Sequence, residues 1–212
     1  MNLRYFLAAV LAAGAALAQT PSGRWDATVT IGTLKVPFQI HFEGEGAAFT
    51  GSLVNGDARI RSKPGSYDGK TARLEFDKSG ARLEATMSNG DLKGTFGAEK
   101  SYQFRAFAFC TCGFAGEAGP DIQGAWDVPD AGWKLSIRRM GEDTLATLTR
   151  GGDNFGPVSG RFNGTFFELS YFDGTRAAVL EIEPSKDKGL DIAWMEPGAA
   201  PKKAKAVRAA SN

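Results

Sequence analysis

Histidine and cysteine are scarce in this sequence, which has one histidine, His41, and two cysteines, Cys110 and Cys112, among 212 residues. A Ser-His-Asp or Cys-His system would depend wholly on that single base. His41 falls on the polar face of an alternating segment, so we interpret it as a surface side chain. The sequence contains no phosphate-binding motif and no cluster of metal ligands, so we expect no cofactor, no metal site and no catalytic residue.

An excess of charge of one sign is also lacking. Lysine and arginine together number 25 and aspartate and glutamate 24, which leaves a formal net charge of +1. Nucleic-acid binding relies on an excess of basic residues, so we expect no nucleic-acid partner. Hydrophobic residues make up 42% of the chain, which is enough for a packed core.

Long apolar runs are absent after the first eighteen residues. Met1 to Ala18 combines the basic Arg4 with a short apolar run and a small residue, Ala16, near its end, as in a secretory signal peptide. The alternative is an N-terminal membrane anchor. We expect export to the periplasm or the extracellular space, with Gln19 as the first mature residue and no stable membrane span after signal removal.

Glycine is abundant, at 27 residues, and several glycines belong to an internal repeat. Residues 23–26 (GRWD) match residues 124–127 (GAWD), and residues 65–69 (GSYDG) match residues 160–164 (GRFNG). Three shorter matches occur in the same order, which indicates a duplication. The predicted organisation is a signal peptide over 1–18, a first β unit over 19–109, a Cys-x-Cys linker over 110–120 and a second β unit over 121–212.

Alternating apolar and polar residues predict strands in both units, for example over 36–42 and 82–87. Turn pairs such as Asn55-Gly56 separate these segments and are typical of tight hairpins. Pro37 indicates an edge or a bulge in its strand. We predict an all-β fold of two tandem antiparallel meander units, each a small up-and-down barrel or a strongly curled sheet of about eight strands. An open sandwich is the alternative.

The first and last strands of each unit resemble the calycin (lipocalin-like) arrangement. In that arrangement a G-x-W motif on the first strand supplies a tryptophan that closes one barrel end, and an arginine from the last strand packs across it. The resemblance implies two barrel-closing pairs, Trp25 with Arg105 and Trp126 with Arg208. It concerns the fold only.

The two cysteines lie two residues apart in the linker. Side chains at this spacing on an extended strand point the same way, so Cys110 and Cys112 are redox candidates. A disulfide between them would close a small, strained ring, and strained disulfides are the more easily reduced ones. The alternatives are a static staple or two inert thiols.

A longer series of motifs runs through nearly the whole mature chain: 23–26 (GRWD), 36–40 (VPFQI), 51–57 (GSLVNGD), 92–97 (LKGTFG) and 206–209 (AVRA). In this order they resemble the N-terminal β-rich region of exported bacterial TlpA-like (thioredoxin-family) thiol-disulfide oxidoreductases. In that family a thioredoxin domain with a C-x-x-C site follows. This sequence contains no C-x-x-C, so the family's catalytic cysteines have no counterpart in it.

The resemblance implies an exported, non-catalytic accessory or binding module, either a truncated relative or a free-standing copy. Its expected partner is a cell-envelope protein or a thioredoxin-like domain. As part of a longer protein, the chain would belong to a thiol-disulfide oxidoreductase. Two alternatives remain open: thiol-disulfide exchange through Cys110 and Cys112, and carriage of a small apolar ligand inside a barrel, although the bulky inward aromatic side chains favour filled interiors.

Overall fold

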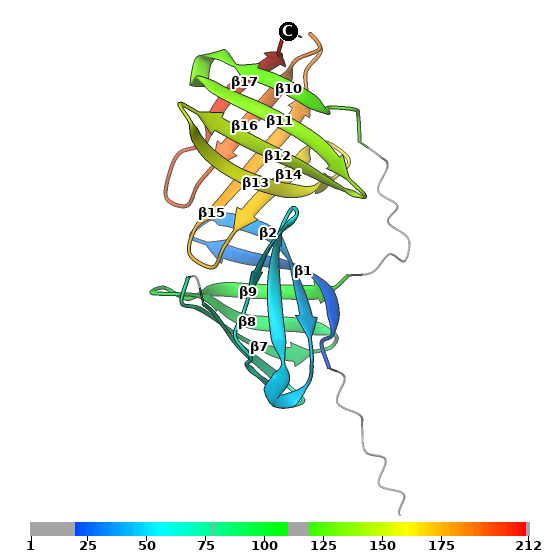
Figure 1. Ribbon diagram of the computed structural model, residues 1–212, viewed down its shortest axis with the longest axis vertical. Helices are drawn as coiled ribbons and strands as arrows, with labels where there is room; N and C mark the ends of the chain where they lie inside the picture. The colour runs from blue at the N-terminus through cyan, green and yellow to red at the C-terminus, as the bar shows by residue number, and fades with distance from the viewer. Residues whose placement is uncertain (1–19, 78, 110–118, 211–212) are drawn as a thin grey trace, which may run out of the picture.

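The computed structural model describes residues 20–77, 79–109 and 119–210. The predicted signal peptide and both cysteines lie outside these ranges. The described chain forms two antiparallel sheets, which lie one above the other in Figure 1. No helix in these ranges is long and apolar enough to cross a membrane.

The first sheet has nine strands and is strongly curled. Its strands are β1 (Gly23–Ile31), β2 (Leu34–Glu43), β3 (Thr50–Asn55), β4 (Ala58–Arg61), β5 (Ser66–Tyr67), β6 (Thr71–Phe76), β7 (Ala81–Ser88), β8 (Asp91–Gly97) and β9 (Tyr102–Ala108). A 3-10 turn, η1 (Gly46–Ala48), precedes β3. The strand order is β4-β3-β2-β1-β9-β8-β7-β6-β5, so β1 pairs with β9 and the sheet is open between β4 and β5.

The second sheet is a closed barrel in which each strand pairs with its neighbours in the chain and the last pairs with the first. Its strands are β10 (Gly124–Val128), β11 (Trp133–Met140), β12 (Asp143–Arg150), β13 (Asp153–Phe162), β14 (Phe167–Phe172), β15 (Ala177–Pro184), β16 (Leu190–Met195) and β17 (Lys202–Arg208). A 3-10 turn, η2 (Pro129–Ala131), follows β10. The prediction of an all-β fold of two antiparallel units, each a barrel or a strongly curled sheet, is therefore confirmed: the first unit is the curled sheet and the second is the barrel.

The residues of the internal repeat occupy matching places in the two units. Trp25 and Trp126 lie on the first strand of each and are 4% and 3% exposed. The glycines two residues before them, Gly23 and Gly124, both have positive φ, at 95° and 122°. A glycine suits this backbone conformation best, which explains why the G-x-W motif begins with one in both copies.

The second repeated motif also has the same structure in both units. A Cβ atom added to Gly65 would lie 2.1 Å from the Arg73 carbonyl oxygen, and one added to Gly160 would lie 1.9 Å from that of Glu168. Each glycine therefore lets its strand approach the next strand closely. Three pairs of repeated positions, Gly23 with Gly124, Trp25 with Trp126 and Gly65 with Gly160, are thus equivalent in the two units, which supports a duplication.

The two units differ where the third strand leads to the later strands. In the barrel, β13 is continuous and pairs with both β12 and β14. In the first unit the corresponding stretch is divided into β4 and β5, with Pro64 between them. Proline has no N–H to donate to a ladder. The residues on either side of it donate in different directions. The Lys63 N–H donates to the Glu75 carbonyl oxygen of β6, and the Gly65 N–H donates to the Phe49 carbonyl oxygen just before β3, both at 2.8 Å.

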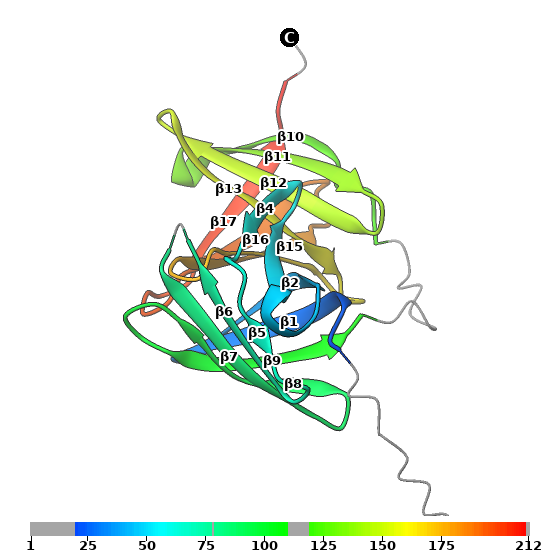
Figure 2. The same ribbon diagram turned by 60° about the horizontal axis from the view of Figure 1, so that its bottom comes forward.

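The core of the curled sheet includes side chains from the barrel. Phe172 at the end of β14 is fully buried, with its ring centroid 4.8 Å from that of Phe38 and 5.1 Å from that of Phe96. Ala177 and Val179 of β15 belong to the same core. Figures 1 and 2 show β15 beside β2 at the junction. The two units therefore share one hydrophobic core at this point.

Candidate ligand site between the two units

Buried hydrogen bonds hold the barrel against the curled sheet. The Asn55 side-chain amide donates to the Phe172 carbonyl oxygen at 2.9 Å, and the Phe172 N–H donates back to the Asn55 Oδ1 atom at 3.1 Å. The Gly56 N–H donates to the Ser159 hydroxyl at 3.0 Å. A buried amide that loses its hydrogen-bond partners lowers the stability of the fold. These bonds therefore favour this one arrangement of the two units over others that would break them.

Pro37 lies where β2 has no neighbour on its β3 side, because the β2–β3 ladder begins only at Gln39. This position agrees with the edge location expected for a strand proline. The free Pro37 carbonyl accepts a hydrogen bond from the Ser170 hydroxyl of β14. The edge of one unit is thus covered by the other.

A cluster of charged side chains crosses the junction beside these bonds. The Arg161 Nε atom of β13 donates to the Asp143 Oδ1 atom at 2.8 Å, and its Nη1 atom lies 3.6 Å from the Asp26 Oδ2 atom of β1. Arg24, also on β1, lies 3.8 Å from the same Asp143 oxygen. Two cations and two anions therefore neutralise one another across the junction.

Phe109 lies between the two arginines of this cluster. The guanidinium carbon of Arg24 is 3.8 Å from the ring centroid, and that of Arg161 is 4.9 Å from it. The Nη2 atoms of both arginines are buried and have no hydrogen-bond partner. Contact with the face of the Phe109 ring partly compensates for the hydrogen bonds that these nitrogen atoms lack.

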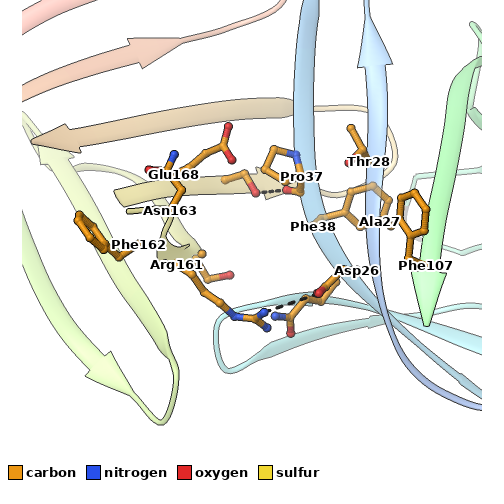
Figure 3. A pocket seen from close by; sticks show the side chains of 14 residues that line it. Asp26, Ala27, Thr28, Pro37, Phe38, Phe107, Arg161, Phe162, Asn163 and Glu168 are labelled. Carbon is orange, nitrogen blue, oxygen red and sulfur yellow. Dashed lines mark hydrogen bonds and ion pairs between the residues drawn. The ribbon is translucent and has the colours of Figure 1, made fainter. Parts of the chain in front are cut away.

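A cavity of about 260 Å³ opens beside the cluster, and its walls come from the outer faces of both sheets. At a share of about 30 Å³ per water molecule, this is room for roughly nine waters. The first unit contributes Asp26, Thr28 and Phe107, and the second contributes Arg161, Phe162 and Glu168. Figure 3 shows these two groups facing each other, with Arg161 reaching toward Asp26.

Two carboxyl groups in the cavity wall have shifted pKa values. Burial raises the pKa of Asp26, although Arg161 and Arg24 counteract that shift. Burial also raises the pKa of Glu168, and the nearby Glu181 carboxylate adds to the shift. Among the described carboxyl groups with a resolved shift, these two alone are raised, and raised values in one cavity are typical of a functional site.

Trp126 and Arg208, one of the two pairs implied by the calycin resemblance, lie in contact. The Arg208 guanidinium carbon is 4.1 Å from the Trp126 ring, and the same side chain donates to the Gln123 carbonyl oxygen. The Trp126 indole N–H donates to the Ile122 carbonyl oxygen at 3.0 Å. Residues from just before the first strand of the barrel and from its last strand thus both contact this tryptophan.

The other pair, Trp25 with Arg105, differs from the expected arrangement. Trp25 points into the curled sheet, whereas Arg105 alternates with the buried Phe104 and Ala106 and so faces outward. Arg105 instead forms an ion pair with Asp91 at 2.9 Å. The register of β1 and β9 is the reason, because it places Arg105 opposite Thr28 and places Ala108 opposite Trp25.

The remaining candidates from the sequence do not join this site. His41 lies on the outer face of β2, where its side chain is 44% exposed and 3.5 Å from Glu43. Cys110 and Cys112 lie outside the described residues. Across the ranges that the structure describes, no three His, Cys, Asp or Glu side chains are grouped closely enough to hold a metal ion.

Packed side chains fill the interior of the closed barrel. Its buried core is made of large apolar residues from all around the sheet, including Trp126, Leu135, Leu148, Leu169 and Ile192. This packing agrees with the filled interior that the inward aromatic residues favour. The described cavity lies outside the barrel, between the units.

The sequence analysis did not identify this cavity or the shared core. A signal is present in the run Ala177-Ala178-Val179-Leu180, where all four residues are buried and the alternation fails. Such a run indicates burial on both faces of a strand. Comparisons with protein-family models, curated proteins and solved structures found no match. The site is therefore interpreted from its geometry.

Proposed function

We propose that the protein is an exported, non-catalytic binding module that receives part of a partner protein in the cavity between its two β units. The observation that carries this proposal is a cavity whose walls come from both units. A site built on strands of two interlocked units keeps its shape before the partner arrives, which lowers the entropic cost of binding.

Three features support rigidity at this site. Phe172 fills the curled sheet, Asn55 bonds both backbone groups of that phenylalanine, and the arginine–aspartate cluster lies beside the cavity. Phe107 is 44% exposed and offers an aromatic surface in the same wall, with the Arg105 guanidinium carbon 4.4 Å from its ring centroid. Exposed aromatic rings of this kind are common anchors for protein partners.

The resemblance to the TlpA-like region agrees with this role, because it implies an accessory module beside a thioredoxin-like domain. Under this proposal the partner is an envelope protein or such a domain, and the compartment is the periplasm or the extracellular space. Thiol exchange through Cys110 and Cys112 makes a different prediction. Replacing Cys110 with serine would abolish it, whereas cavity binding would persist.

A titration by two-dimensional NMR tests the proposal. The isotope-labelled chain from residue 19 onward is titrated with three unstructured twelve-residue peptides, one basic, one acidic and one neutral and apolar. We expect saturable shifts for at least one peptide at Thr28, Phe107 and Ser159. Cys110→Ser is expected to leave these shifts unchanged.

A matched pair of variants provides the control. Thr28→Trp fills the cavity and is expected to abolish the shifts. Thr30→Trp introduces the same ring on the same face of β1, outside the cavity wall, and is expected to preserve them. Absence of saturable binding for all three peptides, or shifts that survive in Thr28→Trp, would overturn the proposal.

A further inference from the structure

We propose that the cavity binds a cationic group, an ammonium or guanidinium on an apolar stem, with Glu168 as its counter-ion. This inference rests on the proposed function, because it names the chemistry of the group that the partner inserts. Its natural source is a lysine or arginine side chain of that partner.

The strand register leaves Glu168 without a cation. On one side it lies directly opposite Arg161 of β13, and on the other directly opposite Glu181 of β15. Side chains opposite each other in a ladder are close enough to pair. Arg161, however, turns to Asp143 and Asp26, and Glu168 has no ion pair or hydrogen bond with any other side chain in the described part of the chain.

The charges around the cavity favour a cation over an anion. Arg161 is the cation of the cavity wall, and it is already bonded to Asp143 at 2.8 Å and lies 3.6 Å from Asp26. An incoming anion would compete with these two carboxylates. An incoming cation would instead meet the unpaired Glu168, with the Glu181 carboxylate one strand away.

Burial strengthens the same preference. Glu168 is half-buried, and burial raises the pKa of its carboxyl, which means that its charge is poorly solvated. A positive group placed beside it would replace the missing solvation and lower that pKa. Charge-assisted hydrogen bonds of this kind are stronger than neutral ones.

The apolar part of the wall suits the stem that carries the charge. Phe107 and Phe162 line the cavity together with Phe38, and Figure 3 shows Phe38 and Phe107 on the side opposite Glu168. Lysine and arginine side chains commonly lay their methylene groups along apolar surface while the charged end reaches a polar partner. A cavity of about 260 Å³ accommodates one such side chain.

Paired peptides test the inference. One hexapeptide carries a single lysine between glycine and serine residues, and its partner carries norleucine, which has nearly the same stem without the charge. We expect the lysine peptide to bind at the cavity about tenfold more tightly, as measured by NMR titration. Pentylamine is the third probe. If pentylamine binds as tightly as the lysine peptide, a free amine is a sufficient ligand. If pentylamine binds more weakly, the peptide around the lysine contributes to recognition.

Variants complete the test. Glu168→Gln is expected to reduce lysine-peptide affinity about tenfold, to the level of the norleucine peptide. Glu183→Gln removes the same charge from an exposed site on the neighbouring strand and is expected to leave affinity within about twofold. Equal binding of both peptides at the cavity, or an unchanged affinity in Glu168→Gln, would overturn the inference and leave the proposed function standing. Absence of cavity binding by every probe would overturn both.

Discussion

The curled sheet and the closed barrel have matching first strands and turns, but each has its weakest contact in a different place. In the curled sheet, first and last strands share six paired positions, from Trp25 to Thr30, and the opening lies at Pro64. In the barrel, first and last strands share only two, at Trp126 and Asp127, and β13 runs through without a break. The interruption at Pro64 thus distinguishes the two units. The barrel, whose β13 is continuous, closes on itself, whereas the curled sheet stays open and includes barrel side chains in its core.

The two tryptophans show the same contrast. The Trp126 indole N–H has a carbonyl partner and an arginine across its ring. The Trp25 indole nitrogen is buried and has no hydrogen-bond partner among the described residues. The curled sheet thus depends on packing from outside, above all on Phe172. Four predictions can break or sharpen this comparison.

The largest effect is expected from Phe172→Ala. This change empties the place that a barrel residue fills in the curled sheet, and it should lower the free energy of unfolding by about 3–5 kcal/mol. Urea denaturation followed by tryptophan fluorescence measures it. Phe155→Ala, at a ring that is 41% exposed, serves as the control and should change stability by less than about 0.5 kcal/mol. A loss below about 1 kcal/mol for Phe172→Ala would mean that the curled sheet is stable without its neighbour.

Asn55→Ala should have the next largest effect. It leaves the N–H and the carbonyl of Phe172 buried and unpaired, which should cost about 2–3 kcal/mol. Asn154→Ala, at an exposed position of β13, should be nearly neutral. The comparison is made by the shift in urea midpoint, and similar shifts for the two variants would contradict the assigned role of Asn55.

The third prediction compares the two arginines of the last strands. Arg208→Ala removes the group that stacks on Trp126 at the short β10–β17 contact, and it should cost about 1–2 kcal/mol. Arg105→Ala removes an outward-facing ion pair with Asp91 and a contact with the exposed Phe107 ring, 4.4 Å from the guanidinium carbon, and should cost less, about 0.5 kcal/mol. Thermal unfolding of the two variants measures the difference. The reverse order would show that the outward arginine of the open unit has the larger role.

The smallest effect concerns pH. The raised pKa of Glu168 means that the folded state binds a proton more tightly than the unfolded state, so the ionised carboxyl lowers stability above that pKa. Glu168→Gln should therefore stabilise the protein by a few tenths of a kcal/mol at pH 8, since the group is only half-buried. The gain should shrink as the pH falls toward the ordinary value of 4.5. Unfolding curves at pH 8, 6 and 4.5 test the trend, and a gain that grows at low pH would contradict it.

The sequence predicted the fold from local signals and failed where distant residues decide. Strand alternation and Asn-Gly turns are local, so the two β units and most strand positions followed from them. The opening in the first unit lies at Pro64, which the sequence analysis did not single out. The pairing of Trp25 with Arg105 was wrong because it requires the exact register of β9, which places Arg105 opposite Thr28 and on the outer face of the sheet.

The candidate site could not be predicted in the same way. Its residues come mainly from β1, β2 and β9 on one side and from β13 and β14 on the other, and nothing in the local sequence brings these outer faces together. The sequence analysis assigned no role to Glu168. Its interest arises only because Arg161, its neighbour in the ladder, is engaged by Asp143 and Asp26.

The side chain that the barrel contributes to the curled sheet also bears on whether the first unit can stand alone. Phe172 belongs to the core of the curled sheet, so a chain shortened to the first unit would have a hole at that place. Such a shortened chain would need a new large side chain there to regain its packing. Because of this one phenylalanine, we expect the curled sheet to be much less stable when it is produced without the barrel.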